Sequence, residues 1–353
     1  MIYKRKMNIL AVTGLSLTLL AACGESTRMD IAEETADQTG LSAAYPTAAP
    51  GQTDTGEVSA EVPVMTPIPL ETPALPPELS AYLAFLSGED KLYVQEGALS
   101  NFYTAYSDVY KGEKVEGREY DLRDILAGYR ENYLWDTEDA DKPEERLRYA
   151  VLDCGGDGEP ELALQISSNY SIENLTLTLI IRHDGERPIM CYAYEEWSRS
   201  GTELYYYGFM PSAGSNGADD HSYWADILDA EGRVRHIEEE EYLTGWDVGA
   251  DMREAYEQVF GPYGNGYDEP LQHTIIRIGE QTFHQYYFFP EEKEPSQEEL
   301  ETFEMLCGEK GLHFVTDEMV EQLLEERCRE FGIKEEWLEE TEVEWSDLWI
   351  MEE

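Results

Sequence analysis

The chain has little positive charge. Its 353 residues include 25 Lys and Arg against 75 Asp and Glu, which gives a formal net charge of −50. A field of this sign repels nucleic acid and anionic lipid headgroups, so we expect neither as a partner. It attracts cations and keeps a protein soluble through self-repulsion, and we expect acidic runs such as residues 237–242 (IEEEEY) to lie on solvated faces.

The common catalytic motifs are also absent. The sequence contains no H-E-x-x-H, no G-x-S-x-G, no G-x-x-x-x-G-K-[ST] and no C-x-x-C pair, which removes the usual signatures of hydrolases, NTPases and zinc sites. Ser215 and His221 lie near each other in a glycine-rich stretch where a nucleophile and a base could meet. Such a stretch more often only connects two strands, so we expect no catalytic residue here and a non-enzymatic protein rather than an enzyme.

Long apolar runs are missing except at the N-terminus. Three basic residues at positions 4–6 precede an apolar run over residues 7–22, which ends at Cys23. This order is typical of a secretory signal peptide, and the run is shorter than a typical membrane-spanning helix. Residues 20–23 (LAAC) resemble the bacterial lipobox. The resemblance implies that 1–22 is a lipoprotein signal peptide and that Cys23 becomes the lipid-bearing N-terminus; an ordinary secretion signal is the alternative.

Two acyl chains hold a protein at a bilayer surface without spanning it. We therefore expect the mature protein on the cell membrane, lipid-anchored and facing outside the cytoplasm. Residues 23–77 are rich in Thr, Ala, Pro and Glu, which predicts a disordered tether. Residues 78–353 are dense in large apolar side chains and are expected to form one extracytoplasmic domain.

Helices are expected at both ends of this domain. Residues 76–88 carry a proline in the first turn and end at Gly88, and a second helix begins after the capping residue Asp121. Ser296 and Glu299 have capping-box spacing. A last helix ends before Gly332 and is predicted to place on its buried face Met319, Val320, Leu323, Leu324 and Phe331.

Strands are expected between the helices. The turns Asp184-Gly185, Gly232 and Gly279 each separate two β-prone runs, which predicts an antiparallel meander. Strands grouped in the middle, with helices before and after them, indicate the α+β class: a central antiparallel β-meander sheet flanked by N-terminal and C-terminal helices.

An acidic loop at residues 153–161 (DCGGDGEPE) is expected to connect two of these strands. With Asp153 at position one, the oxygen-bearing residues occupy positions one, five, seven and nine of an Asp-rich calcium loop. The predicted ligands are Asp153, Asp157, Glu159 and Glu161. An EF-hand is excluded, because position twelve is Leu164 and the flanking segments are strands.

The loop resembles the D-x-[DN]-G-D-G-x-x-[DE]-[LIV] segment of FG-GAP and VCBS-type repeats. It is more similar still to the DxNGDGxPEL segment of uncharacterised Gram-positive lipoproteins, which also have a lipobox, a Thr/Pro linker and an aromatic β-meander. The resemblance implies Ca²⁺ binding and no established activity. Position three, usually Asn or Asp, is Gly155 here, which removes one ligand. The alternative is a tight turn in which Asp153 and Asp157 accept backbone hydrogen bonds without an ion.

The remaining candidates are cysteines and aromatic residues. Cys307 and Cys328 lie on successive predicted helices and form the disulfide that an exported protein would most readily make, although four buried free thiols fit the sequence equally well. Tyrosine-rich runs at 203–209 and 284–289 indicate sheet core or an aromatic platform for glycans or peptides.

Two classes of function fit these observations. We expect a membrane-anchored cell-envelope lipoprotein with an acidic extracytoplasmic domain that binds an unknown extracellular ligand or protein, with a possible calcium-binding loop. The alternative is a surface hydrolase acting on wall or glycan polymer, which predicts convergent carboxylates of raised pKa or His221 beside Ser215.

Overall fold

A computed structural model describes residues 76–98, 116–133, 145–168, 175–215, 220–263, 270–289, 295–339, 341 and 343–351. All of these belong to one compact unit. The predicted signal peptide and all but the last two residues of the predicted tether lie outside the described residues. Within the described part of the chain, no helix has both the length and the apolar character needed to cross a membrane.

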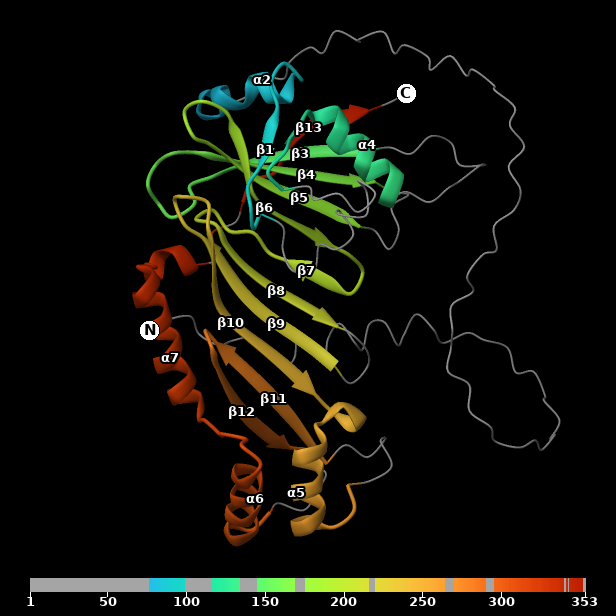
Figure 1. Cartoon of the computed structure of the whole chain (residues 1–353), viewed down its shortest axis with the longest axis vertical. Coiled ribbons are helices and arrows are strands. Elements are labelled where there is room, and N and C mark those ends of the chain that lie inside the picture. Colours follow the sequence, from blue (N-terminus) through green and yellow to red (C-terminus); the bar gives the residue numbers. More distant parts are fainter. Residues whose placement is uncertain are drawn as a thin grey trace, which may run out of the picture. The chain divides into compact units, whose positions relative to one another are not determined.

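The strands of the described residues form two sheets (Figure 1). The first sheet has the strand order β13-β3-β4-β5-β6-β1-β2. Its strands are β1 (Leu92–Val94), β2 (Glu119–Tyr120), β3 (Glu145–Leu152), β4 (Glu161–Ser168), β5 (Thr176–His183), β6 (Pro188–Glu196) and β13 (Ser346–Met351). All neighbours pair antiparallel except β1 and β6, which pair parallel.

The second sheet is a continuous antiparallel meander with the order β12-β11-β10-β9-β8-β7. Its strands are β7 (Ser200–Thr202), β8 (Phe209–Ser215), β9 (Asp220–Leu228), β10 (Val234–Leu243), β11 (Leu271–Ile278) and β12 (Gln281–Phe288). The α+β class is confirmed. The described strands form two sheets, because the chain leaves the first sheet after β6 and returns to it with β13.

The first helices cover one face of the seven-stranded sheet. These are η1 (Pro77–Tyr82), α2 (Leu83–Leu86) and α4 (Leu122–Tyr133). The predicted cap of α4 is confirmed, since the Asp124 N–H donates to Asp121 Oδ1 at 2.8 Å. Apolar side chains of these helices pack with alternate residues of β4, whose Leu162, Leu164 and Ile166 are fully buried.

The later helices pack on the six-stranded sheet. They are η3 (Gly245–Asp247), α5 (Ala250–Phe260), α6 (Gln297–Glu309), α7 (Asp317–Phe331) and η4 (Glu335–Leu338). Ser296 and Glu299 form the predicted capping box, and Gly332 ends α7 in the left-handed conformation with φ 70°. The predicted buried face of α7 is wrong at Met319, which is 48% exposed, whereas the next residue, Val320, is fully buried against Ile276 and Ile278 of β11.

Local turn chemistry predicted the hairpins correctly. Asp184 and Gly185 connect β5 to β6, Gly232 connects β9 to β10, and Gly279 connects β11 to β12. The three glycines have φ of 93°, 71° and 62°, values that L side chains rarely adopt.

The run at 237–242 is not a solvated face throughout, which corrects that expectation. It forms part of β10, whose side chains alternate between the two faces of the sheet. Glu238 and Glu240 point to the face on which α7 packs and are only 5% and 3% exposed, while Glu239 and Glu241 point the other way. The Tyr242 hydroxyl donates to the buried Glu240 carboxylate.

The predicted disulfide is also absent from the structure. Cys307 on α6 belongs to an apolar cluster that includes Phe303 and residues of α5. Cys328 belongs to a different apolar cluster, between α7 and β9. Both thiols are free and buried, as are those of Cys154 and Cys191. The two helices are successive in sequence but cover separate parts of the sheet, so their cysteines face different cores.

Candidate functional site

The acidic loop joins β3 to β4, in the strand-loop-strand context that the sequence predicts. The Gly158 N–H donates to Asp153 Oδ1 and the Glu159 N–H donates to Asp157 Oδ1, both at 2.8 Å. The Cys154 N–H donates to Glu161 Oε2 at 2.7 Å. Three of the four predicted ligands therefore already organise the turn by accepting backbone hydrogen bonds.

Glu161 differs from the other acids of the loop because it is only 4% exposed. Burial raises its pKa, the hydrogen bond from Cys154 lowers it, and the negative charges of Asp157 and Asp153 raise it further; the resulting pKa is about 8. At neutral pH the Glu161 carboxyl is therefore mostly protonated, which is unusual for a calcium ligand.

Gly155 explains why position three carries no ligand. A Cβ at this residue would lie 2.5 Å from the Ala230 nitrogen, in the turn between β9 and β10. The backbone of Gly155 also has φ 73°. No side chain fits between the two backbones, so this position serves close packing instead of ion coordination.

Calcium binding by the loop stays a prediction. Among the described residues, no group of three or more His, Cys, Asp or Glu side chains is arranged to hold a metal ion. Each carboxylate of Asp153 and Asp157 still has a second oxygen outside the bonds described above, which is the chemistry that calcium prefers.

The loop is also the joint between the two sheets. The Asp153 N–H donates to the Tyr206 carbonyl at 2.9 Å and the Gly155 N–H donates to the Tyr207 carbonyl at 3.2 Å. A Cβ at Gly208 would lie 2.9 Å from Cys154 Sγ. These contacts are backbone to backbone or involve glycine, so the sheets approach more closely than side chains would allow.

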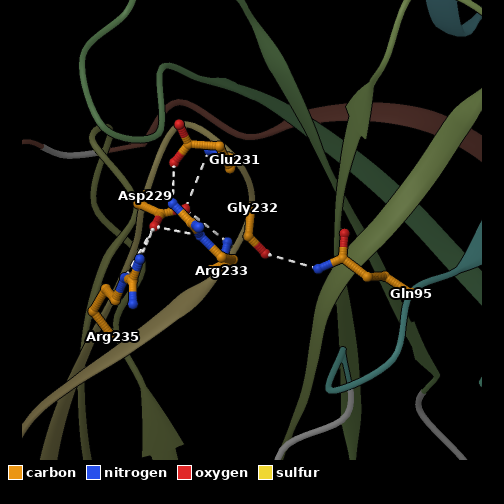
Figure 2. Close-up of polar contacts among 6 residues, drawn as sticks. All are labelled: Gln95, Asp229, Glu231, Gly232, Arg233 and Arg235. Carbon is orange, nitrogen blue, oxygen red and sulfur yellow. Dashed lines mark hydrogen bonds and ion pairs between the residues drawn. The ribbon is translucent and has the colours of Figure 1, made fainter.

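The β9–β10 turn forms the other half of the joint (Figure 2). Asp229 Oδ1 accepts the N–H groups of Glu231 and Arg233, and its Oδ2 accepts from the Arg233 and Arg235 guanidinium groups at 3.0 and 2.9 Å. Burial alone would raise the pKa of Asp229, but these bonds outweigh it and the pKa lies below its ordinary value. Asp229 therefore holds the turn in one shape.

At Gly232, this turn packs closely against the first sheet. A Cβ at Gly232 would lie 2.6 Å from Cys191 Cβ on β6, and Gln95 Nε2 donates to the Gly232 carbonyl at 3.4 Å (Figure 2). The sequence predicted Gly232 as a turn residue only. Its second role depends on a neighbour far away in the chain, for which a single sequence contains no signal.

The structure places Ser215 directly opposite His221. They are cross-strand partners where β8 and β9 meet the 216–219 segment, which lies outside the described residues. Cross-strand register alone does not establish a hydrogen bond between the Ser215 hydroxyl and the His221 ring. A nucleophile and its base need such a bond, so the pairing alone does not make a catalytic dyad.

Within the part of the chain that the structure describes, Glu161 lies far from the other carboxylates of raised pKa, Glu195 and Glu196 at the end of β6. Burial raises the pKa of Glu195 to about 7 and that of Glu161 to about 8. Glu195 lies in register with Ile166, five residues along β4 from Glu161. This offset is roughly 17 Å along the strand, which exceeds the separation of a glycosidase pair.

The face of the six-stranded sheet away from α7 carries a different set of groups. Trp224 on β9 is the partner of Glu239 on β10, which in turn is the partner of Arg277 on β11. Arg277 donates from Nη1 to Glu239 at 2.7 Å and from Nη2 to Glu241 at 2.8 Å. We call Trp224, Glu239, Glu241 and Arg277 the open face, because each side chain is only half-buried.

One end of this face carries an imidazole–carboxylate pair. His236 Nδ1 lies 2.8 Å from Asp226 Oδ1, and the two residues are partners on β10 and β9 just before a β-bulge. Asp226 is 8% exposed, whereas the His236 side chain is 40% exposed. Glu239 and Glu241 were expected only as part of the acidic run 237–242, and the other four residues carry no signal of their own in the sequence. Two-residue alternation places Glu239 with Glu241 and Trp224 with Asp226. His236 reaches the same face only because of the bulge, and Arg277 only through the register of β11 with β10.

The comparisons with known proteins identify no relative. No protein-family model matches the chain, and no match is found among the curated proteins or the solved structures.

Proposed function

We propose that this protein is a lipid-anchored component of the cell envelope whose domain binds a ligand or partner outside the cytoplasm. The proposed location is supported by the sequence, which has a basic start, an apolar run, the LAAC segment ending at Cys23, and a Thr/Pro-rich tether of about fifty residues. A tether of this composition is a spacer between a membrane surface and a folded domain.

The observation that carries the binding role is the open face. It combines a half-buried tryptophan with a guanidinium group held between two carboxylates, on a regular sheet that needs no rearrangement to present them. Rigid groups with fixed directions bind a ligand at a low cost in conformational entropy.

A surface hydrolase is the second candidate, and the pairing of Ser215 with His221 is the observation in its favour. Such an enzyme requires both side chains. Replacing Ser215 by Ala or His221 by Asn would therefore abolish any hydrolysis of a wall or glycan polymer, whereas a binding module retains its ligand affinity in both variants.

Fractionation of a bacterial host that expresses the full chain tests the proposal. We expect the protein in the membrane fraction and accessible to protease added outside intact cells. The Cys23→Ala variant should lose membrane retention, while Cys328→Ala is the matched control. Wild-type protein in the cytosol, or equal membrane retention of the Cys23→Ala variant, would overturn the proposed anchoring.

A further inference from the structure

We propose that the outer edge of β12 is a docking site for a partner protein, which adds an extended, basic segment to the six-stranded sheet. This edge is a different surface from the open face and is independent of the N-terminal anchor. Three of its features support the proposal: free backbone groups, a strand sequence without the usual protection of an edge, and carboxylates on both sides.

The backbone of β12 has free groups on the side away from β11. The His284 N–H donates to the His313 carbonyl at 2.9 Å and the His284 carbonyl accepts from the Val315 N–H at 3.1 Å, so His284 directs its backbone groups to the outer edge. Alternate residues of a strand direct these groups the same way, which places those of Tyr286 and Phe288 on that edge. Within the part of the chain that the structure describes, their outward N–H and C=O groups make no hydrogen bond. They offer an added strand two donors and two acceptors.

β12 differs from the other three edge strands of the described sheets because nothing in its sequence protects it. β2 and β7 have only two and three residues, and the pairing of β13 shifts register between Asp347 and Trp349. β12 pairs with β11 over eight residues without a break, and its sequence QTFHQYYF contains no Asp, Glu, Lys, Arg or Pro. Short strands, bulges, charges and prolines are the usual means of preventing strand addition. Their absence from β12, in a chain with 28% charged residues, indicates an edge at which strand addition is the function.

An exposed aromatic ring lies beside the free backbone groups. Tyr287 is 55% exposed, and its ring packs edge to face against Phe289 with the centroids 6.0 Å apart. Tyr287 follows Phe283 and Gln285 in the alternation of the strand, so its side chain points to the face on which α7 packs. An apolar side chain of the added segment would bury this ring, which adds a hydrophobic contribution to the backbone hydrogen bonds.

The charges beside the edge favour a basic partner. On one face of the sheet the Tyr286 hydroxyl donates to Glu304 of α6 at 2.7 Å, and on the other face Gln285 Nε2 donates to Asp317 of α7 at 2.9 Å. Both carboxylates are exposed, and among the described residues Glu304 has no Lys or Arg partner. Successive residues of an added strand point to opposite faces, so two adjacent basic residues would meet both carboxylates. A second copy of this chain is disfavoured, because its own β12 has no Lys or Arg and each copy has a formal net charge of −50.

Fluorescence anisotropy with labelled peptides tests this proposal on the full chain carrying Cys23→Ser. The probes are the end-blocked peptide TKRVTKRVT, the same peptide with Glu in place of Lys and Arg, and a basic peptide N-methylated at every residue. At physiological ionic strength we expect the basic peptide to bind and the acidic one not to bind. The N-methylated peptide keeps the charges but has no N–H to donate, so it should bind at least about tenfold more weakly. No binding of the basic peptide, or equal affinity of its N-methylated form, would overturn the proposal.

A variant and hydrogen exchange locate the bound peptide. Tyr287→Lys places a positive charge beside the free groups and removes the exposed ring, so it should weaken binding of the basic peptide by about tenfold. Leu83→Lys, which makes the same change of charge at a 36% exposed residue of α2, is the matched control. Bound peptide should slow deuterium exchange of the Tyr286 and Phe288 amides. Unchanged affinity of the Tyr287→Lys variant, or protection only outside residues 285–289, would contradict the assignment.

Sedimentation velocity separates a partner peptide from a second copy of the chain. We expect a monomer with and without the basic peptide. A dimer that the peptide does not dissociate, and that Tyr287→Lys abolishes, would assign the edge to a second copy and overturn the proposal. None of these results bears on the membrane anchoring, which depends on Cys23.

Discussion

Gly155 lies directly against the backbone of Ala230, so closely that a Cβ on Gly155 would stand 2.5 Å from the Ala230 nitrogen. This contact joins the acidic loop of one sheet to the β9–β10 turn of the other. Gly155, which departs from the calcium-loop pattern, is therefore a residue at which the two sheets meet. Its replacement should lower the stability of the fold more than it changes any calcium affinity.

Gly155→Ala should lower the free energy of unfolding by about 3 kcal/mol, because the methyl group combines a backbone clash with a left-handed φ. Gly158→Ala is the matched control in the same loop. Gly158 has φ 82° but no atom within 4 Å of its Cβ position, so only the conformational cost of about 1 kcal/mol applies. Urea denaturation measures both; equal losses would show that Gly155 has no special packing role.

Calcium should bind the loop weakly, with a Kd between about 0.1 and 1 mM, because position three offers no ligand and Glu161 is mostly protonated. At 10 mM calcium the stabilisation would be about 2 kcal/mol, seen as a higher Tm and as heat in calorimetry. Asp157→Asn should remove this effect, whereas Asp184→Asn, in the β5–β6 turn, should not. If calcium gives neither heat nor a Tm shift with the wild-type protein, the loop binds no calcium and serves only to pack the two sheets together.

Stability should fall in acid because of His273. Burial, with a smaller contribution from His284, lowers the pKa of His273 to about 4. Its ordinary pKa of about 6.5 applies to the unfolded chain, so the unfolded state binds more protons below pH 6.5. The contribution of neutral His273 is complete above that pH and is lost as pH falls toward 4, by at most about 1.4 kcal/mol per pH unit.

The comparison that isolates this effect is the free energy of unfolding between pH 7 and pH 4.5 in wild type and in His273→Gln. The variant should show a shallower fall with pH, since Gln does not titrate. His183→Gln, at a half-buried position in the first sheet, is the control. Parallel curves for wild type and His273→Gln would show that protonation of His273 does not destabilise the fold.

The cysteine thiols should be inert in the native protein. Burial raises the pKa of Cys191 and Cys307 to about 12 and that of Cys328 to about 11, and it raises the pKa of Cys154 as well. The thiolate is the reactive species, so a maleimide should label none of them in the folded Cys23→Ser chain. All four should react after denaturation without reductant; labelling of only two would indicate a disulfide after all.

Local features of the fold were predictable because their causes lie within a few residues. Asp121 caps α4, Ser296 and Glu299 form a capping box, and Gly185 and Gly279 turn their hairpins, each through contacts inside one short segment. The same holds for the strand-loop-strand context of the acidic loop.

Features that depend on distant neighbours were not predictable. Glu240 reads as a solvated residue of an acidic run, yet it is buried under α7 beside the Tyr242 hydroxyl. In the sequence, Gly155 is only a position where a calcium ligand is missing, and its close contact with Ala230 appears only in the structure. Trp224 and Arg277 come together only through the register of three strands, which the turn residues alone do not determine.

The most direct test of the proposed function is the mass of the N-terminal peptide of the protein purified from host membranes. We expect a mature chain that begins at Cys23 and carries a thioether-linked diacylglycerol. An unmodified Cys23, cleavage at another residue, or an intact apolar run over residues 7–22 would contradict it and would remove the basis for an envelope lipoprotein.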